Sequence, residues 1–476
     1  MALTFIGLPS ELLDKIIEHS MPEGFESLAV TCKLIYAHCI RFIPHHNHLR
    51  LSFRVFEYSI DEPPCPPREN HNYFAFELLN RIAAEPRVAR YIIEASFCDD
   101  SVPDFYPTSF SPVIDDGSPL VALFANSSYL ARAGLDWKEY YALVKQEVQR
   151  PGYSQHAAAF VLTLLPNVTS LVLPQQWKPS DKTDRLLEVI VREARQPKSI
   201  WNEPSLAKLT GFEPNLGDLN EVVPFLALPH VRRFFSVLGS NCSMTLASKN
   251  QYIGWGEMLE SVSFKFADLE LKYVSEFFTN TPRLKELHLF FTGSLPETED
   301  FCGLVAVIES KVGNQLEELY FYGLERDGFK PGQASLHGFQ RLLTLRCPLK
   351  LAISRTNKAL PRPLKDTDSL KGSESEVIEP SISDLIPDSV TTLSLLTDNE
   401  EHYRMALDIL FSDVVVKEGS KLPFLKKISI YFRWDGSVDV EEAKRLEAKA
   451  LEAGVLLHLH HFNPSGLPYN IEYGNF

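Results

Sequence analysis

The chain has 476 residues, of which 62 are acidic and 47 are basic, so its formal net charge is −15. Hydrophobic residues make up 45% of the chain, which is enough to bury a core and excludes an intrinsically disordered protein. The acidic balance argues against general nucleic-acid binding, which needs clustered Lys and Arg to neutralise phosphates.

The cysteines and the N-terminus indicate an intracellular protein. The seven cysteines are scattered and never spaced as Cys-x-x-Cys, which is typical of reduced thiols rather than of disulfides or a zinc site. The N-terminus lacks the basic region and apolar run of a signal peptide, and no stretch approaches 18 uninterrupted apolar residues. We therefore expect a cytoplasmic or nuclear chain without a membrane segment.

The first 50 residues predict a small helical unit. Pro9 stands near a helix start, where its fixed φ and missing N–H cost little. Four apolar residues then recur at helical spacing and form one stripe: Leu12, Leu13, Ile16 and Ile17. A break at Met21–Gly24 is followed by a second apolar series that ends at Pro44. A unit this short is near the lower size limit for a domain with its own core. We therefore expect it to dock on the rest of the chain or on another protein.

Both halves of this unit together resemble an F-box motif, particularly its fungal form. The matching stretches are Leu8-Pro9-x-Glu11-Leu12-Leu13-x-x-Ile16-Ile17 and Leu28-Ala29-Val30-Thr31-Cys32-Lys33. Many F-boxes place a Trp shortly after the Cys-Lys pair, where this chain has Leu34-Ile35-Tyr36. An unrelated helical cap is the alternative.

The F-box resemblance implies that the unit binds a Skp-type adaptor and, through it, a cullin scaffold. Some residues of the motif must instead hold the helices together, and the sequence does not apportion them. The residues that the resemblance assigns to adaptor binding are Leu8, Pro9, Leu12, Leu13, Ile16, Ile17, Leu28, Val30, Cys32 and Lys33.

Beyond residue 80 a strand unit of the form Leu-x-x-Leu-x-Leu recurs. Copies preceded by proline begin at Pro86, Pro166, Pro204, Pro229, Pro282 and Pro423, and copies without it begin at Leu259, Leu316, Leu342 and Val390. The alternating end of each copy predicts a strand, and the preceding proline suits a strand entry. From residue 206 onward most copies are about 25–35 residues apart, a period typical of solenoids.

Helical segments separate the copies. The predicted helices are Asp184–Arg195, Leu219–Leu226, Leu271–Phe278, Phe301–Lys311, His402–Phe411 and Val438–Ala453, and Val455–Leu459 predicts a closing strand. This alternation predicts an α/β fold, with a parallel sheet on one side and helices on the other. The pattern resembles the irregular leucine-rich repeats of F-box proteins, and an open α/β sheet is the structural alternative.

These features predict three parts of the chain. Residues 1–50 are the helical F-box domain, and residues 51–160 are a mixed connecting region with a first repeat-like unit and a helix at Trp137–Val148. Residues 161–476 are the leucine-rich-repeat-like recognition domain. Residues 355–381 are rich in Ser, Pro, Lys and acids, which predicts a flexible loop inserted between repeats.

Residues that alternate with the core leucines predict a substrate-binding surface. If the strands line a concave sheet, these residues face outward, and aromatic rings beside charges suit a protein ligand. The candidates are Glu286, His288, Phe290, Glu318, Tyr320, Tyr322, Lys427 and Tyr431. The alternative is that these rings only cover neighbouring strands.

No catalytic motif emerges. The chain lacks a phosphate-cradling loop, a nucleophile elbow and a His-Glu-x-x-His motif. The clusters His45-His46-x-His48 and His458-x-His460-His461 bind zinc only if their rings converge, so ordinary roles are favoured. We expect no catalytic, cofactor or metal residues, and a non-enzymatic subunit that recruits a protein substrate to an SCF-type ubiquitin ligase. The alternatives are an adaptor-bound scaffold and an enzyme with an unrecognised site.

Overall fold

The computed structural model describes residues 5–57, 75–97, 119–149, 154–174, 177–178, 180–196, 203–214, 219–238, 252, 254–266, 271–291, 301–322, 335–348, 385–397, 422–432 and 440–461. The chain forms two compact units. Unit 1 comprises residues 1–217 and 221–231, and unit 2 comprises residues 218–220 and 232–476. The fold is α/β: N-terminal helices are followed by parallel strands that keep the order of the chain, with helices between them.

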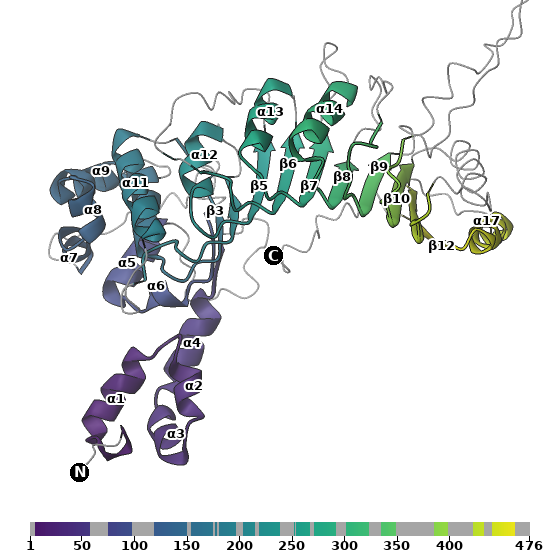
Figure 1. Cartoon of the computed structure of the whole chain (residues 1–476). Helices are drawn as coiled ribbons and strands as arrows, with labels where there is room; N and C mark the ends of the chain where they lie inside the picture. Colours follow the sequence, from purple (N-terminus) through teal and green to yellow (C-terminus); the bar gives the residue numbers. More distant parts are fainter. Residues whose placement is uncertain are drawn as a thin grey trace, which may run out of the picture. The chain divides into compact units, whose positions relative to one another are not determined.

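Unit 1 begins with a group of short helices (Figure 1). These are η1 (Phe5–Gly7), α1 (Ser10–His19), α2 (Phe25–Ala29), α3 (Lys33–Cys39) and α4 (Ile43–Phe53). Pro44 lies in the first turn of α4, where proline is tolerated. A new helix therefore begins where the second apolar series ends, and the first histidine cluster lies on it rather than beyond a helix end.

The rest of unit 1 places further helices around four strands. The helices are α5 (Ala75–Ala84), α6 (Val88–Tyr91), α7 (Pro119–Ala125), α8 (Ser128–Arg132), α9 (Trp137–Gln149), α10 (Gln155–Val161), η4 (Leu162–Leu164), α11 (Asp181–Arg195) and most of α12 (Leu219–Leu226). The strands are β1 (Val55–Glu57), β2 (Glu94–Ser96), β3 (Ser170–Val172) and β4 (Gly211–Glu213), and they pair in parallel in that order.

Unit 2 continues the parallel pattern with eight described strands. They are β5 (Arg233–Leu238), β6 (Ser261–Phe266), β7 (Glu286–Phe291), β8 (Glu318–Tyr322), β9 (Thr344–Pro348), β10 (Thr392–Thr397), β11 (Lys427–Phe432) and β12 (Leu456–His461). Its described helices are α13 (Leu271–Thr279), α14 (Phe301–Val312) and α17 (Val440–Glu452). In Figure 1, α13 and α14 cover the same side of β5–β8.

The strand copies predicted in unit 2 are confirmed residue by residue. The second apolar residue of each copy pairs with its counterpart on the next strand: Phe234, Val262, Leu287, Leu319, Leu345, Leu393 and Ile428. These side chains are all buried. The three helices predicted between residues 219 and 311 also form within one residue of their expected bounds. The predicted helix His402–Phe411 and the predicted loop 355–381 lie outside the described residues.

Two copies in unit 1 are shifted from the prediction. Leu171 of β3 pairs with Ala95 and Phe212, whereas the pattern aligned it with Tyr91 and Leu209. In the first copy, Val88–Tyr91 forms the short helix α6 and the strand follows it. Apolar residues three apart fit one helical turn as well as a strand entry, so the spacing alone was ambiguous.

Phenylalanines on the helix side of unit 2 decide which sheet face is the core. Phe277 of α13 packs on Phe264 of β6 with ring centroids 4.9 Å apart, and on Phe234 of β5 at 5.8 Å. All three side chains are buried. Because successive strand residues point to opposite faces, the residues that alternate with these rings lie on the other face of the sheet.

Candidate functional site

The N-terminal helices carry two apolar rows with different environments. On α1, Leu13 and Ile17 are buried in the group formed with α2 and α3. Leu12 and Ile16, one turn apart on the same helix, are 47% and 38% exposed. The helix therefore closes a small core with one row and presents an open apolar face with the other.

The second half of the predicted motif shows the same division. Ala29, Ile35 and Cys39 are buried, and burial raises the pKa of the Cys39 thiol. Val30, between α2 and α3, is 82% exposed, and Lys33 is also exposed. The connection between the two helices therefore adds an apolar side chain to the accessible surface.

The ten residues assigned to adaptor binding thus have three kinds of environment. Pro9, Leu12, Ile16, Val30 and Lys33 are exposed, Leu8, Leu28 and Cys32 are half-buried, and Leu13 and Ile17 are buried and hold the helices together. Three further exposed apolar residues were not assigned to this surface: Leu34, Tyr36 and Ile40. The helical period was the available signal, because Tyr36 and Ile40 lie one turn apart.

Polar contacts attach this helical group to the rest of unit 1. Glu23 accepts hydrogen bonds from Arg90 at 2.5 Å and from the side-chain amide of Asn167 at 2.6 Å. Glu18 forms an ion pair with Arg87 at 2.6 Å. Asn167 is buried, so its bond to Glu23 is shielded from water. The open apolar face is therefore carried by helices that are anchored to the first strands.

A second candidate surface is built by the register of β7 and β8. His288 lies opposite Tyr320, and Phe290 lies opposite Tyr322. Both pairs are stacked, with ring centroids 4.2 Å apart in the first and 4.3 Å in the second. The register places six predicted residues on neighbouring strands, all half-buried: Glu286, His288, Phe290, Glu318, Tyr320 and Tyr322.

Both carboxylates of this face are engaged by their neighbours. His288 Nε2 lies 2.7 Å from a carboxylate oxygen of Glu286, and this hydrogen bond lowers the pKa of the Glu286 carboxyl. The Tyr320 hydroxyl donates to Glu318 at 2.5 Å. Burial, together with that carboxylate, raises the pKa of Tyr320. The rings therefore lie beside acids that already accept hydrogen bonds from their neighbours.

The predicted residues of β11 belong to the same face of unit 2. Tyr431 stacks on His460 of β12 with ring centroids 4.7 Å apart. The guanidinium of Arg346, on β9, lies 4.2 Å from the ring centroid of Tyr431 and 4.8 Å from that of Tyr322. Lys427, at the start of β11, is half-buried. Arg346 therefore bridges the rings of β8 and β11.

Sequence reasoning missed Arg346 and His460, although the signal was present. Arg346 stands between Leu345 and Cys347, and His460 follows Leu459 at the alternating position of its strand. The alternation was applied only to the copies of β7, β8 and β11. Applied to β9 and β12, it places both side chains on the same face.

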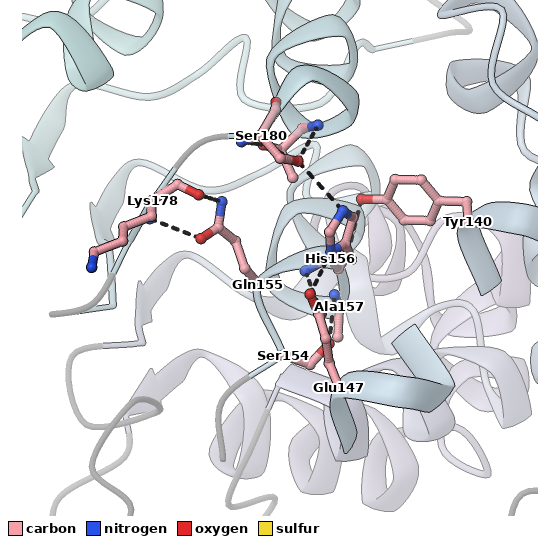
Figure 2. Close-up of polar contacts among 9 residues, drawn as sticks. Tyr140, Glu147, Ser154, Gln155, His156, Ala157, Lys178 and Ser180 are labelled. Atoms are coloured by element: carbon pink, nitrogen blue, oxygen red, sulfur yellow. Dashed lines mark hydrogen bonds and ion pairs between the residues drawn. The ribbon is translucent and has the colours of Figure 1, made fainter. Parts of the chain in front are cut away.

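A polar cluster in unit 1 joins α9, α10 and the start of α11 (Figure 2). Glu147 Oε1 lies 2.6 Å from His156 Nδ1, and His156 Nε2 lies 3.4 Å from Ser180 Oγ. In a nucleophilic triad with this order, base and hydroxyl approach within about 2.6–3.2 Å. Here Ser180 is the N-cap of α11, and its hydroxyl accepts a hydrogen bond from the Thr183 backbone N–H. We interpret the cluster as a set of structural contacts that hold α9, α10 and α11 together.

The first histidine cluster contacts protein side chains. His45 pairs with Glu85 at 2.8 Å, and His46 Nδ1 lies 2.7 Å from the Tyr91 hydroxyl. Burial lowers the pKa of His46, which favours its neutral form. Among the described residues, no three His, Cys, Asp or Glu side chains stand together as a set of metal ligands.

Comparison with known proteins does not assign the chain to a family. No protein family model matches the chain, and no curated protein matches it significantly. Within the described part of the chain, no helix combines the length and apolar character needed to cross a lipid bilayer. The two surfaces above are therefore the features on which a function can be argued.

Proposed function

We propose that this chain is a substrate-recognition subunit of an SCF-type, cullin-based ubiquitin ligase. In this proposal α1–α3 act as an F-box that binds a Skp-type adaptor, and the parallel-strand face of unit 2 binds a protein substrate. The supporting observation is the open apolar row of α1 and the exposed Val30, which lie on the stretch that resembles an F-box.

The energetics favour a protein partner for this apolar row. Burying apolar surface contributes roughly 25 cal/mol per Å² removed from water, so exposed Leu12, Ile16 and Val30 side chains gain when a partner covers them. Their own helical group has no unfilled core position for them, because Leu13, Ile17 and Ile35 occupy it. Exposed Lys33 supplies a charge at the rim, as is usual at protein interfaces.

The proposed role needs no bond-making group in this chain. Ubiquitin transfer takes place on partner subunits, and this subunit raises the effective concentration of the substrate near them. The stacked rings of unit 2 provide aromatic side chains of the kind that dominate binding energy at interfaces.

The decisive experiment measures adaptor binding by a double variant, Leu12→Ala with Ile16→Ala. Losing one central apolar anchor costs about 2 kcal/mol, or about thirtyfold in Kd, so we expect at least that loss of affinity for a purified Skp-type adaptor. The matched control is Leu51→Ala with Leu451→Ala, since these leucines are 84% and 80% exposed and lie outside the motif. Equal adaptor affinity of the double variant and the control would refute the proposal.

A second measurement separates a degradation subunit from an adaptor-bound scaffold. Cells that lack the chain should accumulate the proteins that co-purify with it, because those proteins are no longer ubiquitinated. If the adaptor binds but the half-lives of co-purifying proteins do not change, the scaffold alternative is correct.

A further inference from the structure

Five planar groups stack in sequence across the strand face of unit 2. They are contributed by β7, β8, β9, β11 and β12 and are Phe290, Tyr322, Arg346, Tyr431 and His460. Four of them are rings, and the guanidinium of Arg346 is the central member. The stack is therefore built around one cation.

Small residues on the intervening strands make room for this cation. Arg346 pairs in register with Ser394 of β10, which in turn pairs with Ser429 of β11. Both serines are buried. Because Tyr431 is on β11, the side chain of Arg346 reaches across β10 to contact it. The short serine side chains leave space for the guanidinium between the tyrosines of β8 and β11.

The stacked guanidinium has no anionic partner in the described part of the chain. It contacts the rings of Tyr322 and Tyr431 and donates a hydrogen bond to the neutral Tyr322 hydroxyl, and its Nε is buried without a hydrogen-bond acceptor. The acids on the same face, Glu286 and Glu318, are engaged by His288 and Tyr320. A buried donor on a charged group without an acceptor is costly, so this arrangement favours an acceptor that comes from outside.

The acids of this face lie on β7 and β8, whereas the alternating residues of β9, β10, β11 and β12 include the cations Arg346 and Lys427 and no carboxylate. Burial lowers the pKa of His460, and Lys427 and Arg346 lower it further. A positive patch in a chain with a net charge of −15 is a local feature that attracts acidic groups. The partner that fits this face by charge complementarity is acidic.

We propose that Arg346 binds the carboxylate of an Asp or Glu side chain of a substrate protein. This residue belongs to an extended segment of the substrate that lies across β7–β12. The rings of Tyr322 and Tyr431 restrict the guanidinium, and the N–H groups of a planar guanidinium match the two oxygens of a planar carboxylate. The flanking rings take apolar side chains of the same segment. This assignment rests on the proposed function and gives the substrate class that unit 2 selects.

The test is a selection of displayed random 12-residue peptides on the purified full chain without adaptor. Wild-type protein should enrich Asp or Glu at one position at least fivefold over the starting library. Arg346→Gln should abolish this enrichment, whereas the control Arg341→Gln should preserve it, because Arg341 is exposed and precedes β9. Enrichment that survives Arg346→Gln, or no acidic enrichment by the wild type, overturns the proposal.

Two further measurements test whether binding needs the planar guanidinium of Arg346 and a carboxylate on the peptide. Arg346→Lys keeps the charge but loses the planar fork, so the selected peptide should bind it at least tenfold more weakly than it binds wild type. If a phosphoserine in place of the selected acid binds more tightly than the acid itself, the carboxylate assignment is wrong.

The same preparations distinguish this inference from the function on which it rests. Adaptor affinity depends on α1–α3 and should be equal in wild type, Arg346→Gln and Arg341→Gln. If the chain selects acidic peptides but does not bind the adaptor, the proposed ligase function is wrong and the role of Arg346 stands. Adaptor binding without acidic selection refutes the role of Arg346 alone.

Discussion

Glu213, the last residue of β4, is a carboxyl group in an unfavourable environment. It lies opposite Val172 of β3, and no described side chain forms an ion pair or hydrogen bond with it. Burial raises the pKa of this carboxyl from 4.5 to about 7. A raised carboxyl pKa means that the folded state binds the proton more tightly, so the contribution of Glu213 to stability is fully present below pH 4.5 and is lost as the pH rises through 7.

We therefore predict that Glu213→Gln removes a pH-dependent loss of stability. From pH 5 to pH 8 the wild type should lose up to about 3 kcal/mol relative to the variant. Urea unfolding at both pH values measures the difference. Glu94→Gln, on β2 of the same unit, is the matched control and should follow the wild type. If Glu213→Gln has the same pH profile as the wild type, Glu213 is not buried as described.

At the scale of elements, one carboxylate organises the start of α10. Glu147 accepts hydrogen bonds from the Ser154 hydroxyl at 2.9 Å, from the His156 backbone N–H at 3.2 Å and from the His156 ring at 2.6 Å. Burial acts to raise the pKa of Glu147, but these hydrogen bonds outweigh it and the net pKa is lowered. The contribution of Glu147 to stability is therefore present above pH 4.5 and is lost as the pH falls through the lowered pKa.

Glu147→Ala should consequently destabilise unit 1 at neutral pH. It leaves part-buried donors of Ser154 and His156 without an acceptor, which costs about 2 kcal/mol. Gln146→Ala is the control, since Gln146 is exposed on the same helix. Thermal unfolding at pH 7 and at pH 3.5 gives the comparison, and the destabilisation by the variant should be smaller at the lower pH. Equal destabilisation at both values would show that the charge is not the cause.

The strand copies show where element-level prediction works and where it fails. In unit 2, each copy combines an alternating end with a buried second leucine, and strand pairing follows the predicted register. In unit 1, the copy at Val88–Tyr91 folds as a helical turn. A helical turn and a strand entry both bury apolar residues that are three positions apart. Packing therefore decides which residues form the strand that pairs with Leu171.

At the scale of the whole molecule, the attachment of the N-terminal helices matters most for the proposed function. Glu23 links them to Arg90 and to the buried Asn167. Phe25, His46 and Tyr91 add ring contacts at 4.6 and 5.5 Å between centroids. These contacts belong to unit 1 and lie apart from exposed Leu12 and Ile16 in the sequence. Anchoring and the proposed adaptor binding therefore use different residues of the same helical group.

We predict that Glu23→Ala loosens the helical group without reducing adaptor affinity. The buried amide of Asn167 loses one acceptor and Arg90 loses its ion pair, which costs about 1 kcal/mol, a factor of about five in the opening equilibrium. Hydrogen exchange of α1–α3 amides should become faster by that factor, and exchange in unit 2 should not change. Glu11→Ala, an exposed acid on α1, is the control. A drop in adaptor affinity with Glu23→Ala would contradict this separation.

The sequence by itself determined the α/β class, the parallel strand order and the positions of α9, α11, α12, α13, α14 and α17. These depend on local periodicity, which a single chain displays directly: period 2 in the Leu-x-Leu ends and period 3.6 in the helices. The residues that alternate with the leucines of β7 and β8 were found for the same reason.

Only the tertiary structure decided which apolar residues stay open and which cations lack a partner. Leu12 and Leu13 are neighbours with the same chemistry, and only packing makes one exposed and the other buried. Arg346 became visible as a site because two tyrosines from different strands enclose it, a contact between residues more than twenty positions apart. Long-range contacts of this kind leave no periodic trace in the sequence, so they had to be observed.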